Sequence, residues 1–150
     1  MILTPEERRR VVEQAEAEYP AECCGVLMIR RGAEPERLLW PCRNMQNELH
    51  ERDPERHPRD ARTAYSIAAK DLQTIVARES QGYEVAVIYH SHIDVGAYFS
   101  ATDKQNALMH GEPPYPEAIY VVVSVMGGKA GDIRAFAWQA AARDFVESQL

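Results

Sequence analysis

The stretch Val85-Ala86-Val87-Ile88-Tyr89-His90-Ser91-His92 decides the fold of this chain. Its first five residues are apolar, uncharged and rich in β-branched side chains, a pattern that predicts a short buried strand. Side chains two positions apart on an extended chain point to the same face, so we expect His90 and His92 to lie side by side. Ser100 and Asp103 complete a longer pattern: His-x-His, seven residues, Ser, two residues, Asp.

Two imidazoles and one carboxylate are a suitable ligand set for Zn²⁺, and a catalytic zinc keeps its fourth position for water. The pattern therefore predicts a site for one zinc ion per chain, with His90, His92 and Asp103 as ligands. Ser100 and Asp103 are also typical of a helix start, as the N-cap residue and the third helical residue. The two interpretations are compatible, because a helix N-terminus would hold Asp103 rigidly. The alternative is a capped helix beside two ordinary strand-end histidines.

Glu22 is the candidate for proton transfer. A zinc site of this kind needs a group that takes a proton from water, and a nearby carboxylate can then pass it to a leaving amine. Glu22 lies outside the charged runs of the chain and close to the apolar residues 26–29. Composition alone favours a solvent-facing Glu at a strand entrance. A thiol nucleophile at Cys23 or Cys24 is disfavoured, because it needs a base and the best histidines are assigned to the metal.

Together, Glu22, His90, His92, Ser100 and Asp103 match the motif of the JAMM metalloproteases (MPN-plus, Mov34 type), a Glu followed by His-x-His-x₇-Ser-x₂-Asp. The chain resembles that family over its whole length. The resemblance implies an α/β fold, a mixed β-sheet flanked by helices with a cytidine-deaminase-like architecture. It also implies that His90, His92 and Asp103 bind zinc, that Glu22 is the general acid and base, and that Ser100 helps to hold the tetrahedral oxyanion.

Within this family the chain looks most like the short prokaryotic members, on the strings Glu22–Leu27, Tyr89–His92 and Ala97–Ser100. Several of those members are similar to peptidases of small ubiquitin-like sulfur-carrier proteins, which end in Gly-Gly. The resemblance implies a peptidase or isopeptidase that hydrolyses the amide bond after that Gly-Gly and releases a cysteine or another short tail. Such a tail would bind extended, as an added strand beside the site.

Two other classes of protein compete with this interpretation. A non-catalytic MPN-type scaffold would bind a ubiquitin-like partner without zinc, but such scaffolds lack the ligands that are present here. Zinc deaminases use His-x-Glu with Pro-Cys-x-x-Cys, whereas this chain has His92 in place of that Glu and lacks the second Cys after Pro41-Cys42. One departure from the JAMM pattern is Phe99, since many members place Pro before the motif serine.

Composition bounds the remaining possibilities. A chain of 150 residues predicts one domain, residues 1–150, with a sizeable core. With 17 basic and 23 acidic residues the net charge is −6, so nucleic acid is not an expected partner. No apolar run approaches membrane-spanning length, and the charged start Met1–Arg8 is unlike a signal peptide. Three cysteines without Cys-x-x-Cys spacing predict a reduced, cytoplasmic protein. An exposed strand edge would permit a homodimer.

The predicted elements follow an α/β order. The capping box Thr4-Pro5-Glu6-Glu7 starts a helix that ends before Pro20. The remaining predictions are strands over 24–30 and 37–41, a helix over 66–80, the histidine-bearing strand, a helix after Ser100, strands over 118–126 and 133–138 joined by a glycine-rich turn, and a short terminal helix over 140–150.

Residues 44–62 are expected to be the least folded segment. They interleave arginines with acidic residues and hold few apolar side chains, so they can bury little surface. The favoured interpretation is a solvated mobile loop. The alternative is a flap that orders when a substrate tail docks and whose arginines meet acidic patches on a carrier protein. His50, His57 and His110 are not expected to be ligands, since none repeats the His-x-His spacing.

The loop between the candidate ligands holds three further residues of interest. Tyr98 and Phe99 either line the cleft or pack the loop against the sheet, and the sequence favours neither. Asp94 is an extra acid that either supports a ligand histidine or has no role.

Overall fold

The structure, a computed structural model, describes residues 1–150. Four helices and six strands follow one another along the chain. Their bounds are α1 Pro5–Glu18, β1 Cys24–Arg30, β2 Glu36–Cys42, α2 Gln46–Arg52, α3 Ala69–Glu79, β3 Tyr83–Ile93, α4 Ala101–Asn106, β4 Ile119–Met126, β5 Lys129–Gln139 and β6 Asp144–Ser148.

One mixed sheet carries the fold, with the strand order β2-β1-β3-β4-β5-β6. Only β3 and β4 are parallel, with His90 opposite Val122, and the other neighbouring pairs are antiparallel. A parallel pair needs a crossover connection, and the chain makes it through the loop and α4 that follow β3. This connection brings α4 close to the end of β3.

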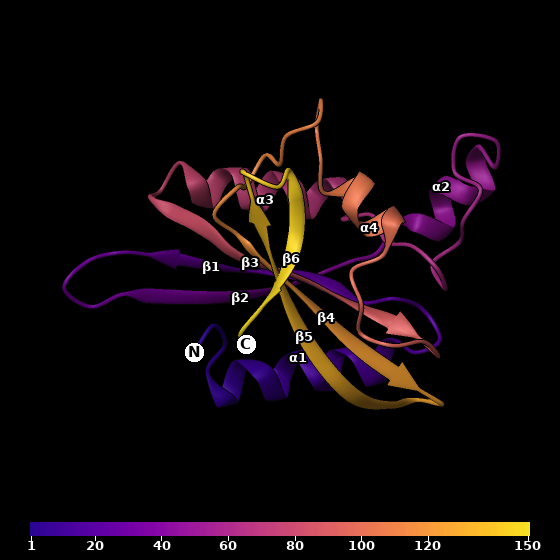
Figure 1. Cartoon of the computed structure of the whole chain (residues 1–150), viewed down its shortest axis with the longest axis horizontal. Coiled ribbons are helices and arrows are strands. Elements are labelled where there is room, and N and C mark those ends of the chain that lie inside the picture. The colour runs from indigo at the N-terminus through magenta and orange to yellow at the C-terminus, as the bar shows by residue number, and fades with distance from the viewer.

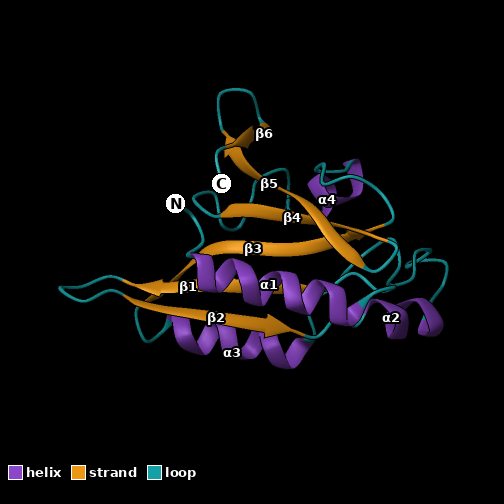
Figure 2. Ribbon diagram, turned by 90° about the horizontal axis from the view of Figure 1, so that it is seen from below, coloured by secondary structure: helices purple, strands orange, loops and turns teal.

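Helices cover both faces of the sheet, as Figures 1 and 2 show. Helix α1 packs on β2, β4 and β5, and α3 packs on β3. The two faces have separate apolar clusters, one containing Val11 and Ala15 of α1 and the other containing Ile75 of α3. Because successive residues of a strand face opposite sides, Tyr89 belongs to the α1 face, whereas Ile88 belongs to the α3 face. The α/β class and the flanked mixed sheet are therefore confirmed.

The absence of a side chain at Gly25 is required by the packing of Tyr89. The two residues are partners in the antiparallel pairing of β1 and β3. A Cβ atom at Gly25 would lie 2.1 Å from the Tyr89 hydroxyl oxygen, which is closer than real contacts allow. The hydroxyl donates to Oε1 of Gln14 over 2.6 Å, and Nε2 of Gln14 donates to the Cys24 carbonyl over 3.0 Å. This packing ties α1 to the strand that follows Glu22.

The prediction of a terminal helix over 140–150 is wrong, because residues 144–148 form the edge strand β6. Its Phe145 is buried in an aromatic cluster, with its ring centroid 5.0 Å from that of Phe99 and 5.3 Å from that of Tyr120. Strand pairing with β5 and this burial outweigh the local preference of the segment.

The prediction of a mobile loop over 44–62 is also wrong. The segment contains helix α2 and is fixed by side-chain hydrogen bonds to the backbone. Nδ2 of Asn44 donates to the carbonyl oxygens of Glu22 and Ala64, and Nε2 of the buried Gln46 donates to the carbonyl oxygen of Arg59. Short polar side chains thus replace the apolar core that the segment lacks.

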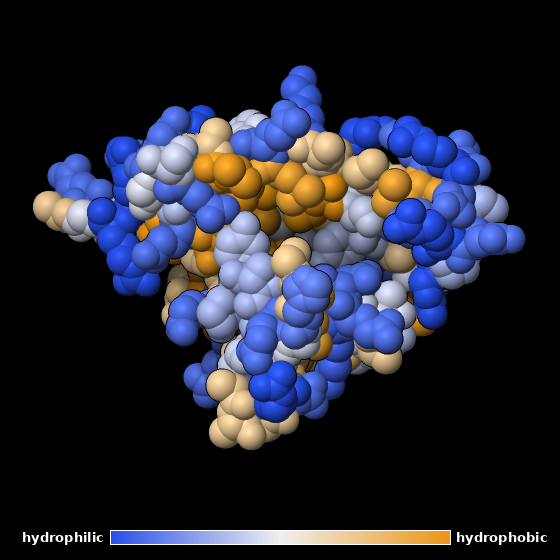
Figure 3. Space-filling model, turned by 90° about the horizontal axis from the view of Figure 1, so that it is seen from above, coloured by the Kyte–Doolittle hydropathy of each residue, from blue (hydrophilic) through white to orange (hydrophobic).

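No helix of the chain combines the length and the apolar character needed to cross a membrane. Figure 3 views the molecule from the side where α3 lies in Figure 1, and there apolar side chains gather in a band between hydrophilic ones. Leu72 and Val76 of α3 are exposed apolar residues. Leu72 and Tyr115 also line a mostly apolar hollow beside this helix.

Candidate metal centre

The end of β3 and the start of α4 position three side chains of the predicted site. His90 and His92 alternate with buried neighbours on the strand and therefore share its α3 face, as the period of two requires. Asp103 is the third residue of α4, where a complete capping box fixes it. The Ser100 hydroxyl accepts from the Asp103 amide over 3.0 Å, and Asp103 Oδ2 accepts from the Ser100 amide over 3.0 Å. The capping prediction is confirmed.

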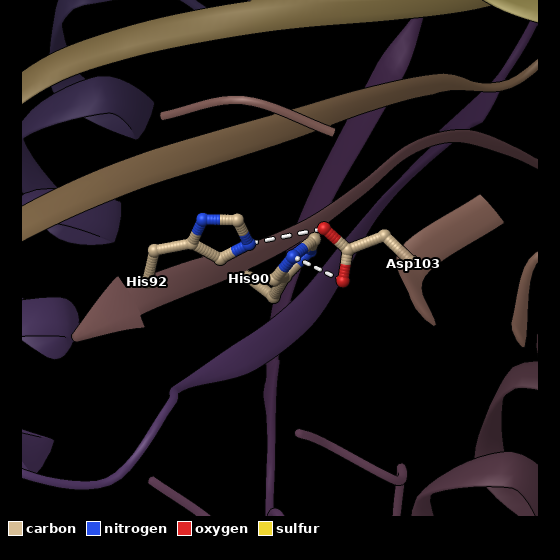
Figure 4. A group of neighbouring side chains, drawn as sticks. All are labelled: His90, His92 and Asp103. Carbon is tan, nitrogen blue, oxygen red and sulfur yellow. Dashed lines mark hydrogen bonds and ion pairs between the residues drawn. The ribbon is translucent and has the colours of Figure 1, made fainter. Parts of the chain in front are cut away.

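Both imidazoles point at one carboxylate, as Figure 4 shows. Nε2 of His90 lies 3.1 Å from Oδ1 of Asp103, and Nε2 of His92 lies 3.0 Å from Oδ2. One potential ligand atom from each residue lies within 4.8 Å of those of the other two, and all three residues are buried. His50, His57 and His110 lie outside this cluster.

The hydrogen-bond pattern of the imidazoles fits a cation at this point. Nδ1 of His92 lies 2.8 Å from the Gly96 carbonyl oxygen, which can only accept, so this nitrogen carries the hydrogen. The Nε2 atom of a neutral His92 then presents a lone pair to a carboxylate oxygen. The approach of His90 Nε2 to Asp103 does not meet the geometry of a hydrogen bond, so neither ring nitrogen of this fully buried residue has a hydrogen-bond partner. Buried nitrogen and oxygen atoms whose lone pairs face one another in this way form a ligand set that suits a divalent metal ion.

Burial and mutual contact set the charges of the cluster. Burial lowers the pKa of His90, against the opposing effect of Asp103, and so keeps this imidazole neutral. Burial alone would raise the pKa of Asp103, but the Ser100 amide and an imidazole that carries a proton toward the carboxylate hold it well below its ordinary value. Two neutral imidazoles and one ionised carboxylate are the protonation states that metal ligation requires.

Glu22 lies just before β1, and the structure brings it to the same pocket as His92, Ser100 and Asp103. This pocket has a volume of about 360 Å³. Glu22 is buried, so the interpretation as a solvent-facing residue is wrong, and its Oε1 atom has no hydrogen-bond partner. Burial raises the pKa of Glu22 to about 9, with a smaller contribution from the charge of Asp103 and an opposing one from Arg59. A buried, unpartnered carboxyl group in a cleft marks a candidate functional residue.

Aromatic side chains surround the imidazoles. Tyr65 stacks on His90 with ring centroids 4.5 Å apart, and Tyr98 meets His92 edge-on at 5.0 Å. Tyr98 is half exposed and lines the pocket, whereas Phe99 is buried among aromatic residues of the α3 face. Tyr98 therefore lines the cleft, whereas Phe99 packs the loop against the sheet.

Sequence reasoning missed the arginines of the pocket wall. Arg59, Arg62 and Thr63 line the pocket with the motif residues. Asp94 accepts hydrogen bonds from Arg62 and Tyr19 side chains and does not support a histidine. The one feature of the sequence that could have indicated these arginines is their density in residues 44–62, and that density is equally typical of a solvated loop.

Two features of the chain argue against other site assignments. A larger cavity of about 520 Å³ lies at the other end of β3, around Tyr83 and Tyr115, and it contains none of the motif residues. Cys23 and Cys24 are buried free thiols, and burial raises the pKa of Cys23 to about 12. A thiol in this state is a poor nucleophile, because the thiolate is the reactive form.

A mixed α/β sheet that presents a buried His-His-Asp cluster beside a carboxyl group defines a class of domains with a candidate metal site. Residues 4–139 match the model of the family described as prokaryotic homologs of the JAB domain, and the chain belongs to that family. The resemblance to the JAMM/MPN family is thereby confirmed.

Relatives with curated names agree with this assignment. The chain is 32% identical over 127 residues to a protein of Mycobacterium tuberculosis named CysO-cysteine peptidase, and to its counterpart in Mycobacterium bovis. The match covers 84% of this chain and 74% of each relative. A relative of this chain is therefore named as a peptidase.

Solved structures show the same fold. A protein of Desulfitobacterium hafniense superposes with a TM-score of 0.66 at 20% identity, over 97% of this chain and 88% of that one. A protein of Salinibacter ruber superposes with a TM-score of 0.60 at 25% identity, over 98% of this chain and 88% of that one. The fold is thus shared over nearly the whole chain.

Proposed function

We propose that this chain is a zinc-dependent peptidase that hydrolyses the amide bond after the C-terminal Gly-Gly of a small ubiquitin-like sulfur-carrier protein. The released group is a cysteine or another short tail. The observation that carries this proposal is the convergence of His90, His92 and Asp103, two of which line one pocket together with Glu22 and Ser100. Membership of the prokaryotic JAB family and the name of the mycobacterial relatives support the substrate class.

In this proposal His90, His92 and Asp103 hold one Zn²⁺ per chain. A zinc ion bound there would polarise the scissile carbonyl and lower the pKa of a water molecule. The protein fixes the three ligands independently of each other: the sheet holds His90, the Gly96 carbonyl orients His92, and the capping box orients Asp103. Such supporting hydrogen bonds set the direction of each ligand atom.

Glu22 moves the proton. It takes one proton from the attacking water as the C–O bond forms, and it then gives that proton to the nitrogen of the leaving amine as the C–N bond breaks. The ionised form is needed for the first transfer. Burial disfavours that form in the bare cluster, and the positive charge of a divalent ion would restore it.

Ser100 stabilises the oxyanion. Its Oγ already accepts the Asp103 amide, so the cap uses a lone pair of the hydroxyl and leaves its hydrogen free to donate. Ser100 lines the pocket beside Glu22, which places this donor near the reacting carbonyl. A fixed donor of this kind stabilises the negative charge that develops on the carbonyl oxygen.

Three broader features complete the proposal. Residues 1–150 form one JAMM/MPN-plus domain, which the single continuous sheet supports. The protein works in the cytoplasm, which is consistent with three buried free thiols. Homodimerisation through an edge strand is permitted by the edges β2 and β6.

The test is cleavage of a sulfur-carrier protein that ends in Gly-Gly and carries one additional cysteine. Zinc-loaded wild type is expected to release the cysteine, as followed by mass spectrometry, and His92→Ala is expected to lack both zinc and activity. His57→Ala is the matched control, because His57 lies outside the cluster and should leave cleavage unchanged.

The scaffold alternative predicts a different outcome. A non-catalytic MPN-type scaffold would bind the same carrier protein without zinc and without turnover. Carrier binding that is equal in wild type and in His92→Ala, with no cleavage by either, would favour the scaffold.

A further inference from the structure

The pocket beside Glu22 has a cationic wall. Arg59 and Arg62 both line it, opposite in charge to Glu22 and Asp103. Arg62 donates to Asp94 over 2.9 Å, and Asp94 also accepts from the Tyr19 hydroxyl, so the Arg62 charge already has a partner. Arg59 takes part in none of the ion pairs of the chain. The pocket thus holds one unpaired guanidinium group.

The backbone around Arg59 is fixed relative to Glu22. The Glu22 amide donates to the Ala61 carbonyl over 2.7 Å, and the Ala61 amide donates to Oδ1 of Asn47 over 2.8 Å. The Arg59 carbonyl accepts from Nε2 of the buried Gln46 over 2.8 Å. Arg59 therefore belongs to the built wall of the site.

We propose that Arg59 binds the free α-carboxylate of the residue that is released, so that the pocket selects a single C-terminal residue after the scissile bond. This inference rests on the proposed peptidase function and names the determinant of its specificity. Arginine suits the role because its planar guanidinium group matches a carboxylate with two parallel hydrogen bonds. Hydrolysis consumes one water, breaks the C–N bond and leaves the amine with a proton from Glu22, and Arg59 forms no covalent bond.

The charges of the pocket match the product. A released amino acid carries an amine at one end and a carboxylate at the other, and the pocket offers Glu22 to the first and Arg59 to the second. A longer tail would place a neutral amide at Arg59 and leave the guanidinium group without its partner. Selectivity for a single released residue then has two sources. The single residue forms an ion pair with Arg59, and a longer tail leaves the charge of Arg59 unpaired in the pocket.

The test compares two substrates that differ only in this carboxylate. A carrier thioester is ligated either to L-cysteine or to L-cysteinamide, and kcat/KM is measured with zinc-loaded protein. We expect wild type to favour the acid, and Arg59→Ala to lose about 10- to 100-fold on the acid while it cleaves the amide as wild type does. Arg59→Lys is expected to recover part of the loss. Arg56→Ala removes the same charge from the same segment outside the pocket, and should match wild type.

Binding provides a second readout. In the Glu22→Gln background, calorimetry should show tighter binding of the acid than of the amide, and Arg59→Ala should abolish the difference. Equal cleavage of both substrates by wild type would overturn the role of Arg59 and leave the peptidase intact. An equal loss on both substrates in Arg59→Ala and Arg56→Ala would assign the arginines to carrier docking. Failure to cleave either substrate would overturn the peptidase function, and equal binding of the two would overturn this inference as well.

Discussion

Nε2 of His92 lies 3.0 Å from Oδ2 of Asp103, while the hydrogen of that imidazole is held on Nδ1 by the Gly96 carbonyl. An acceptor therefore faces an acceptor inside a buried cluster, an arrangement that is unfavourable unless a cation or a proton lies between them. The same carboxylate oxygen also accepts from the Ser100 amide, so Asp103 cannot turn away without breaking the cap of α4. The geometry of the cluster is thus coupled to the start of the helix.

Two substitutions at Asp103 separate its two roles. Asp103→Asn keeps an oxygen that can accept from the Ser100 amide, but it removes the negative charge from the cluster. We expect it to lose bound zinc while the stability of the metal-free protein changes little. Asp103→Ala should lose zinc and also about 1 kcal/mol of stability through the broken capping box. Elemental analysis and denaturant titration measure the two effects, and a full zinc content in Asp103→Asn would reassign the third ligand.

Glu22→Gln tests proton transfer without disturbing the ligands. Glutamine has nearly the volume of glutamate and cannot take up the proton, so turnover should fall by about 10²–10⁴-fold. Zinc content should remain that of wild type, because Glu22 lies outside the three-residue cluster. Cleavage of the carrier fusion and elemental analysis on the same sample check both statements. Wild-type turnover in this variant would contradict the proposed role.

The raised pKa of Glu22 predicts how stability depends on pH in the metal-free protein. The pKa of this group is near 4.5 in the unfolded chain and about 9 in the folded protein. Between these values the unfolded chain binds fewer protons, so stability falls as pH rises, by at most about 1.4 kcal/mol per pH unit. Below pH 4.5 both states are protonated, and the penalty is absent.

Glu22→Gln isolates that contribution. With a chelator present, the variant should match wild type near pH 4.5 and become more stable than wild type as pH rises toward the folded pKa of about 9. Thermal denaturation across this range measures the difference between the two proteins. A difference that stays constant with pH would show that Glu22 does not titrate as its burial requires.

The grouping of His90, His92 and Asp103 could be predicted from the sequence because it depends largely on local rules. The strand period places His90 and His92 on one face, and the capping box sets Asp103 at the start of α4. Both rules act over a few residues and can be applied without tertiary structure. The convergence of the strand end with the helix start follows from no local rule, and it was expected from the suitability of the three residues as a ligand set and from the resemblance to a family.

The wall of the pocket could not be predicted in the same way. Arg59 reaches the site because Asn44, Gln46 and Asn47 bond to distant backbone groups, and such partners leave no periodic signal. A segment with few apolar residues normally remains unfolded. Similarly, β6 depends on the burial of Phe145 among side chains from elsewhere in the chain, and the residue preferences of the segment itself do not reveal that burial.

Gly25→Ala should destabilise the protein through contact with Tyr89. The added Cβ would meet the aromatic ring within 2.6 Å, and the ring is fully buried and cannot move aside. Overpacking of this kind costs about 1–3 kcal/mol. Gly32→Ala is the control, because a Cβ atom there meets no atom within 4 Å, and it should change stability by less than about 0.5 kcal/mol. Urea denaturation of the three proteins gives the comparison, and equal midpoints would refute the predicted clash.

Ser100→Ala should slow hydrolysis more than it weakens the fold. The substitution removes the hydroxyl donor from the pocket, and loss of one oxyanion donor costs about 10²–10³ in kcat. It also removes the acceptor for the Asp103 amide, which costs about 1 kcal/mol of stability. Ser100→Thr retains the hydroxyl and should keep both the cap and most of the rate. Measuring kcat, zinc content and stability in both variants separates the roles, because a merely structural Ser100 would lose stability without a loss of rate per zinc-loaded molecule.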